Sequence, residues 1–149
     1  MRIFLMEDDP HYRRALKSYL ELLGHEVIDS EDPSGCPIYN ELAEECQHDF
    51  PCGDMLLIDN NMPKMTGLEF LKRQSERGCK GMMKNKALMS AGLSDEERDQ
   101  AREMGCQVFT KPFRLYRLRE WIEDAILEYP EKQRLHNFEK PSVERSATL

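Results

Sequence analysis

The sequence lacks any uninterrupted apolar run that approaches the roughly 20 residues needed to cross a bilayer. Charged residues make up 33% of its 149 residues, and its mean hydropathy is −0.70. The N-terminus also lacks the pattern of a secretory signal or transit peptide, because the apolar residues 3–6 run directly into three acids. These absences predict a soluble, cytoplasmic protein with no membrane association.

The cysteines lack the spacing of a disulfide framework. There are five of them, an odd number, widely scattered and without any CxxC pair, so we expect reduced thiols. Cys46, His48 and Cys52 lie close enough in sequence to suggest a structural zinc, but no fourth ligand with recognisable spacing accompanies them. Since a free cysteine packs as a small hydrophobe, ordinary packing is the favoured interpretation.

A stripe of Lys and Arg residues is also missing. The net charge is −7 and the pI is about 5.2, so the chain should repel a phosphate backbone. Direct binding of DNA or RNA is therefore not expected. The length favours one domain with a single sizeable core.

Short apolar segments alternate with amphipathic ones along most of the chain. The predicted strands are residues 3–6, 26–28, 55–58, 87–89 and 108–110. Predicted helices cover residues 10–23, a weak segment around Ile38, Leu42 and Cys46, and residues 66–77, 95–104 and 115–129. The alternation predicts a doubly wound α/β fold, with a parallel sheet covered by helices on both faces. We expect residues 1–129 to form the domain and 130–149 a flexible tail without an output domain.

Polar side chains stand at four predicted strand ends, where open parallel sheets bind their ligands. They are Glu7, Asp8 and Asp9 after the first strand, Asp59 after the third, Ser90 after the fourth and Lys111 after the fifth. Crowded carboxylates favour a hard divalent cation such as Mg²⁺. A carboxylate can itself accept a phosphoryl group, and Asp59 is the candidate. Lys111 and Ser90 would then contact the phosphoryl oxygens and draw their loops inward.

Four motifs in order carry a family resemblance: IFLMEDDP, MLLIDNNMPKMTGLEFL, LMSAG and VFTKPF. Over about residues 1–129 the chain resembles the receiver domain of bacterial two-component response regulators. The resemblance implies a flavodoxin-like (βα)5 fold, with Glu7, Asp8, Asp59 and the backbone carbonyl of Asn61 holding Mg²⁺ or Mn²⁺. It makes Asp59 the phosphoacceptor, Ser90 the hydroxyl contact and Lys111 the ion pair to the phosphoryl group.

The same resemblance implies the partners. A sensor histidine kinase or a histidine phosphotransfer protein would donate the phosphoryl group, and a downstream protein would read the signal. A dimer that forms on phosphorylation is left open. Such a protein assists its own phosphorylation and dephosphorylation but turns over no metabolic substrate, so we do not expect an enzyme.

Three departures from the family pattern leave an alternative open. The stretch 30–53 is longer than usual, position 108 is valine where an aromatic is common, and Lys84-Asn85-Lys86 precedes the fourth strand, which should therefore be short or start late. The rival function is a degenerate receiver that binds or dimerises without phosphate. An aspartyl-nucleophile phosphatase is disfavoured because Asn61 stands where a second acid is needed. Taken singly, Asp59 could cap a helix, Glu7 and Asp8 could form a solvated turn, and Ser90 and Lys111 could be ordinary surface residues.

Overall fold

The computed structural model describes residues 1–39, 45–79, 85–129 and 132–138. Its sheet has five strands in the order β2-β1-β3-β4-β5, and all neighbouring pairs are parallel. The strands are β1 (Arg2–Met6), β2 (Glu26–Ser30), β3 (Met55–Asp59), β4 (Lys86–Ser90) and β5 (Gln107–Thr110). The predicted parallel sheet is confirmed, and β3 lies at its centre with every residue buried.

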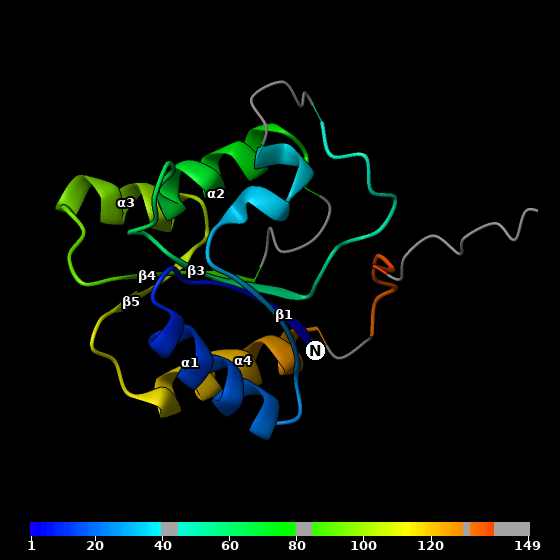
Figure 1. The fold of residues 1–149 in the computed structure, drawn as a ribbon, viewed down its shortest axis with the longest axis horizontal. Coiled ribbons are helices and arrows are strands. Elements are labelled where there is room, and N and C mark those ends of the chain that lie inside the picture. Colours follow the sequence, from blue (N-terminus) through cyan, green and yellow to red (C-terminus); the bar gives the residue numbers. More distant parts are fainter. Residues whose placement is uncertain (40–44, 80–84, 130–131, 139–149) are drawn as a thin grey trace, which may run out of the picture.

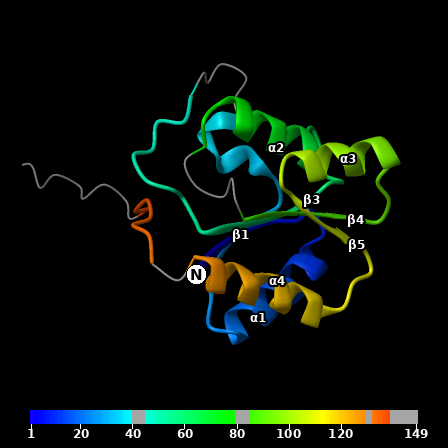
Figure 2. The same cartoon turned by 180° about the vertical axis from the view of Figure 1, so that it is seen from behind.

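Helices cover both faces of this sheet, as the alternation predicted. They are α1 (Pro10–Leu22), α2 (Gly67–Glu76), α3 (Asp95–Glu103) and α4 (Leu115–Glu128). Figures 1 and 2 show α1 and α4 side by side on one face, with α2 and α3 on the other. Each layer buries its own apolar cluster against the sheet, so the fold is doubly wound. No helix within the described ranges is long and apolar enough to cross a membrane.

The residues before α1 and α2 explain where these helices start. The Asp9 carboxylate accepts the backbone N–H groups of His11 and Tyr12, and Pro10 occupies the first helical position, where no N–H is needed. Thr66 and Glu69 form a reciprocal capping box at the start of α2. Both helices therefore begin directly beside the carboxyl ends of β1 and β3.

The described part of the chain contains four α-helices. Between β2 and β3 the described residues form two 3₁₀ turns, Pro33–Gly35 and Pro37–Tyr39. The weak helix predicted in this region is described only at its two ends. Ile38 is buried as expected, Cys46 lies in irregular backbone, and Leu42 lies outside the described residues.

Strand β4 was expected to be short or to start late in the sequence, and this expectation is wrong. It begins at Lys86, spans five residues and is buried throughout. Lys86 is only 2% exposed, and burial lowers the pKa of its ammonium, although the nearby Cys106 and Cys79 thiols act in the opposite direction. The polar start of this strand is thus built into the α2–α3 side of the core.

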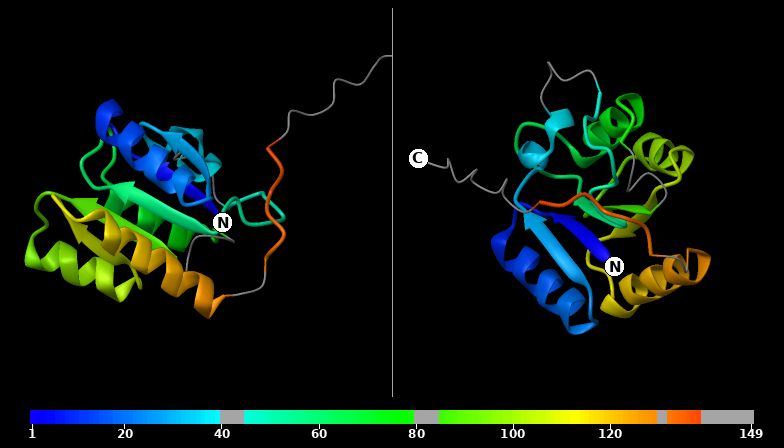
Figure 3. Two further views of the ribbon diagram at one scale, coloured as in Figure 1. Left: turned by 90° about the horizontal axis from the view of Figure 1, so that it is seen from below. Right: turned by 90° about the vertical axis from the view of Figure 1, so that its right-hand side faces the viewer.

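The segment 132–138 runs beside the loop that precedes β3 (Figure 3). The N–H of His136 donates to the carbonyl of Pro51 over 2.7 Å, and the His136 ring stacks on His48 with 3.8 Å between centroids. Phe138 contacts Phe4 with ring centroids 5.9 Å apart. Residues 130–131 and 139–149 lie outside the described residues, so the boundary at residue 129 stays a prediction.

Candidate functional site

Two neighbouring strands deliver three carboxylates to one edge of the sheet. Glu7 and Asp8 directly follow β1, and Asp59 is the last residue of β3. Since Met6 is in register with Ile58, the chain places Glu7 next to Asp59. One oxygen atom from each of Glu7, Asp8 and Asp59 lies within 4.8 Å of the others, and no second group of three close metal-ligating side chains occurs in the described ranges.

Lys111 enters this cluster from the end of β5. Its Nζ lies 2.7 Å from Glu7 Oε2 and 3.1 Å from Asp59 Oδ1. Its backbone N–H donates to the carbonyl of Ser90 over 2.9 Å, which fixes the residue at the carboxyl end of β4, and the Lys111–Pro112 peptide is cis. The structure therefore brings an ammonium from the fifth strand to the carboxylates of the first and third.

Burial sets the electrostatics of the two inner carboxylates. Glu7 is 1% exposed and Asp59 2%. Burial raises the pKa of both groups above their ordinary values, although the nearby Lys111 ammonium counteracts it. For Lys111, burial acts to lower the pKa, but the contacts with the Glu7 and Asp59 carboxylates outweigh it and the pKa is raised. The cluster therefore has negative charge that one lysine does not fully neutralise.

Asp59 also has a polar atom without a hydrogen bond. Its buried Oδ1 makes no hydrogen bond in the described structure, and its partner is the Lys111 ammonium, 3.1 Å away, in an ion pair. A carboxylate oxygen with a single ion-pair partner keeps a lone pair that can bind a further ligand. Hard carboxylate oxygens from Glu7, Asp8 and Asp59 are the ligands that Mg²⁺ prefers. The residues present therefore fit a divalent cation of this class.

Ser90 and Asn61 lie beside the cluster with different local roles. Ser90 is buried at the end of β4, and its Oγ accepts the N–H of Gly92 over 3.2 Å. Asn61 is exposed, and its backbone N–H acts to lower the pKa of the Asp59 carboxyl. The metal contact of the Asn61 carbonyl and the phosphoryl contact of Ser90 stay predictions.

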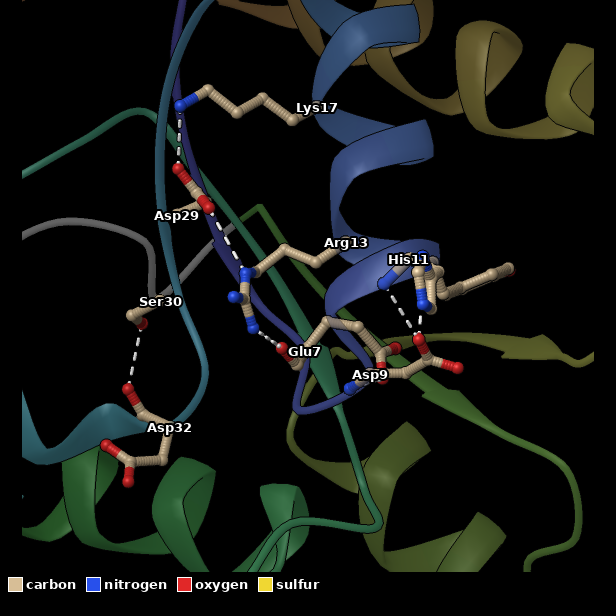
Figure 4. A network of polar contacts seen from close by, with 9 residues as sticks. Glu7, Asp9, His11, Arg13, Lys17, Asp29, Ser30 and Asp32 are labelled. Carbon is tan, nitrogen blue, oxygen red and sulfur yellow. Dashed lines mark hydrogen bonds and ion pairs between the residues drawn. The ribbon is translucent and has the colours of Figure 1, made fainter.

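Sequence reasoning missed two residues that hold the cluster in place. Arg13 donates to the Glu7 carbonyl over 2.6 Å and pairs with Asp29 over 3.2 Å, while Lys17 binds the other oxygen of Asp29 over 2.7 Å. Figure 4 shows this connection from Lys17 through Asp29 and Arg13 to Glu7. The signal was present in the four-residue spacing of Arg13 and Lys17, which places both on one face of α1.

The second missed contact involves Tyr12. Its ring lies under the Lys111 ammonium, 4.5 Å from Nζ to the ring centroid, a cation–π distance. Tyr12 packs against the core on the α1–α4 side. The sequence pattern gave no sign of its contact with a lysine 99 residues away.

The zinc site considered for Cys46, His48 and Cys52 finds no support. His48 Nδ1 lies 2.9 Å from Cys52 Sγ. However, within the part of the chain that the structure describes, three ligating atoms converge only at the acidic cluster. Burial raises the pKa of Cys52 to about 12, and the nearby Cys36, Cys79 and Cys46 thiols add to this effect. Cys46 and Cys52 pack against the α2–α3 core as small hydrophobic side chains.

Comparisons with known proteins agree with this geometry. A family model described as the response regulator receiver domain matches residues 3–123. The response regulator receiver protein CpdR of Brucella abortus is 32% identical over 126 residues, covering 85% of this chain and 97% of that protein. The transcriptional regulatory protein FlgR of Helicobacter pylori is 28% identical over 95% of this chain, which spans only about a third (33%) of that protein's length.

Among solved structures, a CheY-like response regulator receiver domain protein of Methanospirillum hungatei superposes with a TM-score of 0.66. It is 26% identical, and the match covers 85% of this chain and 94% of that one. The similarity extends along nearly the whole length of that domain.

Proposed function

The chain belongs to the response regulator receiver family, and from this premise we propose that it is a phosphorylation switch that carries the phosphoryl group on Asp59. The observation that carries the proposal is the Asp59 carboxylate, which is buried, has one oxygen without a hydrogen bond and stands between an ammonium and two further carboxylates. A cap for the following helix needs none of these features, and Thr66 already caps α2.

The proposed step is a phosphoryl transfer to a carboxylate oxygen. An oxygen of Asp59 attacks phosphorus, a new P–O bond forms, and the bond from phosphorus to the donor breaks, its electron pair leaving with the donor. Lys111 pairs with the phosphoryl oxygens, and the Ser90 hydroxyl donates a hydrogen bond to one of them. A divalent ion held by Glu7, Asp8, Asp59 and the Asn61 carbonyl would supply charge neutralisation at the phosphoryl group.

The partners in this proposal come from the family. The donor is a sensor histidine kinase or a histidine phosphotransfer protein, acting in the cytoplasm, and the output is binding to another protein. Glu7 and Asp59 support the proposal because both carboxylates are buried beside a single ammonium. Asp59 also keeps an oxygen without a hydrogen bond, which is available to a metal ion or to phosphorus.

The test is the intact mass of the protein after incubation with acetyl phosphate and Mg²⁺. We expect the wild type to gain one phosphoryl group and Asp59→Asn to gain none. Asp54→Asn is the matched control, because Asp54 lies at the opposite end of β3 and should leave the adduct unchanged. Absence of an adduct in the wild type, or an equal adduct in Asp59→Asn, would support the phosphate-independent binding module instead.

A further inference from the structure

Four aromatic rings form a continuous series of contacts that starts at Lys111. The Lys111 ammonium lies over Tyr12, and the Tyr12 ring meets Phe113 edge-on, with centroids 6.5 Å apart. Phe113 lies 5.0 Å from Phe109, and Phe109 meets Trp121 edge-on at 5.8 Å. We call these four residues, Tyr12, Phe113, Phe109 and Trp121, the aromatic chain. It crosses from α1 through β5 to α4, the two helices that share one face of the sheet (Figures 1 and 2).

The rings of the aromatic chain pack closely enough for a displacement of one ring to affect the next. The ring separations lie within the range at which aromatic pairs prefer edge-to-face or tilted packing. Phe109 is buried, and Tyr12, Phe113 and Trp121 pack against the same apolar cluster. Because densely packed side chains cannot deform continuously, a shift of one ring forces its neighbour to move.

Lys111 is the group that phosphorylation would move. It now divides its charge among Glu7, Asp59 and the Tyr12 ring. A phosphoryl group adds between one and two negative charges and three acceptor oxygens, which outcompete a neutral ring for the ammonium. The Tyr12 ring would therefore lose its cation when Asp59 is phosphorylated.

The far end of the aromatic chain reaches a helix with an exposed surface. Trp121 is partly buried on α4, and Tyr116 and Leu115 on the same helix are exposed. Val108 occupies the position at which an aromatic residue is common in the family, so this position has no ring that could respond to the phosphoryl group. The neighbouring Phe109 contacts both Phe113 and Trp121 and offers another connection.

We propose that the aromatic chain links the state of the phosphorylation site to α4, with the Lys111–Tyr12 contact as its sensing end and Trp121 as its reporting end. This inference rests on the proposed phosphorylation of Asp59. A series of contacts amounts to coupling only if removing one member changes the response at the other end. The experiment therefore measures the response at Trp121 and the phosphoryl adduct separately.

Trp121 is the only tryptophan of the protein, so its fluorescence reports on the end of the aromatic chain directly. We expect acetyl phosphate with Mg²⁺ to change the Trp121 emission of the wild type in proportion to the adduct found by intact mass. In Phe113→Leu, the change per phosphorylated molecule should fall by about half or more, because the middle contact is lost. Tyr19→Leu is the control, since Tyr19 lies on α1 and packs against the same cluster outside the aromatic chain.

The outcomes separate the two proposals. An adduct without an emission change in the wild type, or an undiminished change in Phe113→Leu, overturns the aromatic chain and leaves phosphorylation of Asp59 standing. Absence of any adduct overturns both. A further comparison needs no phosphate: Lys111→Met should change the Trp121 emission of the wild type but have at most a small effect in a Tyr12→Leu background. Equal changes in the two backgrounds would show that Tyr12 does not carry the signal.

Discussion

The two ends of strand β3 carry the same residue type in opposite circumstances. Asp54, before the strand, accepts the N–H of Arg2 over 2.7 Å and the Gln133 side chain over 2.9 Å, one on each oxygen. Asp59, at the other end, is almost fully buried and leaves Oδ1 without a hydrogen bond. A carboxylate whose two oxygens both accept hydrogen bonds from its own chain contributes to stability, whereas a buried one with an oxygen that makes only an ion pair keeps a lone pair available for a ligand.

The cations at the two ends differ in the same way. Arg2 donates to the carbonyls of Cys52 and His136 and pairs with Glu26, so its planar guanidinium is used as a fixed fork between three segments. Lys111 is a point charge that pairs with two carboxylates of a crowded cluster. The contacts at the amino end of the sheet therefore hold three segments in fixed positions. At the carboxyl end, an added negative charge would change the contacts of Lys111.

The largest stability effect should come from removing the cation at the carboxyl end. Lys111→Met leaves Glu7 and Asp59 buried and unpaired, and breaking such a pair typically lowers the free energy of unfolding by about 3 kcal/mol. Urea unfolding at neutral pH without divalent ions measures this loss. Lys17→Met is the control, because its more exposed pair with Asp29 should be worth about 0.5 kcal/mol. Equal losses in the two variants would mean that the buried ion pairs of Lys111 contribute no more to stability than the more exposed pair of Lys17 does.

A smaller loss is expected at the amino end. Arg2→Met keeps the side-chain length but removes the donors to Cys52 and His136, and we expect it to lower the free energy of unfolding by about 2 kcal/mol. The acetyl phosphate adduct on Asp59 should be unchanged, because Arg2 lies at the other end of β1. Loss of the adduct in a still folded Arg2→Met protein would contradict the claim that the amino end contributes to stability alone.

The sequence predicted the carboxyl end better than the amino end, for a physical reason. Parallel strands bring their carboxyl ends to one edge, so Glu7, Asp59 and Lys111 could be grouped from strand order alone. The contact of Arg2 with His136 joins residues 134 positions apart and leaves no periodic signal. Likewise, the two 3₁₀ turns at Pro33–Gly35 and Pro37–Tyr39 were not predicted from the sequence. Regular elements follow local patterns, whereas contacts between irregular segments depend on the completed fold.

The smallest predicted effect is the change in the free energy of unfolding when the aspartate at either end of β3 is replaced by asparagine. At pH 7.5 this change should have opposite signs at the two ends. The pKa of Asp59 is raised above its ordinary value of 3.8, chiefly by burial, so between that value and its native pKa the folded state binds more protons than the unfolded state. Stability from this group is therefore present at low pH and is lost as pH rises through the native pKa. Asp59→Asn removes the buried charge and should gain about 1 kcal/mol over the wild type at pH 7.5.

That gain should shrink at an acidic pH below the raised native pKa of Asp59, where the wild-type carboxyl takes up its own proton. Asp54→Asn should instead lose stability at pH 7.5, since its two oxygens already accept hydrogen bonds and the amide replaces one acceptor by a donor. Urea unfolding of the three proteins at the two pH values measures the comparison. Two losses of similar size at pH 7.5 would mean that Asp59, like Asp54, is held by its own chain rather than kept available for a phosphoryl group.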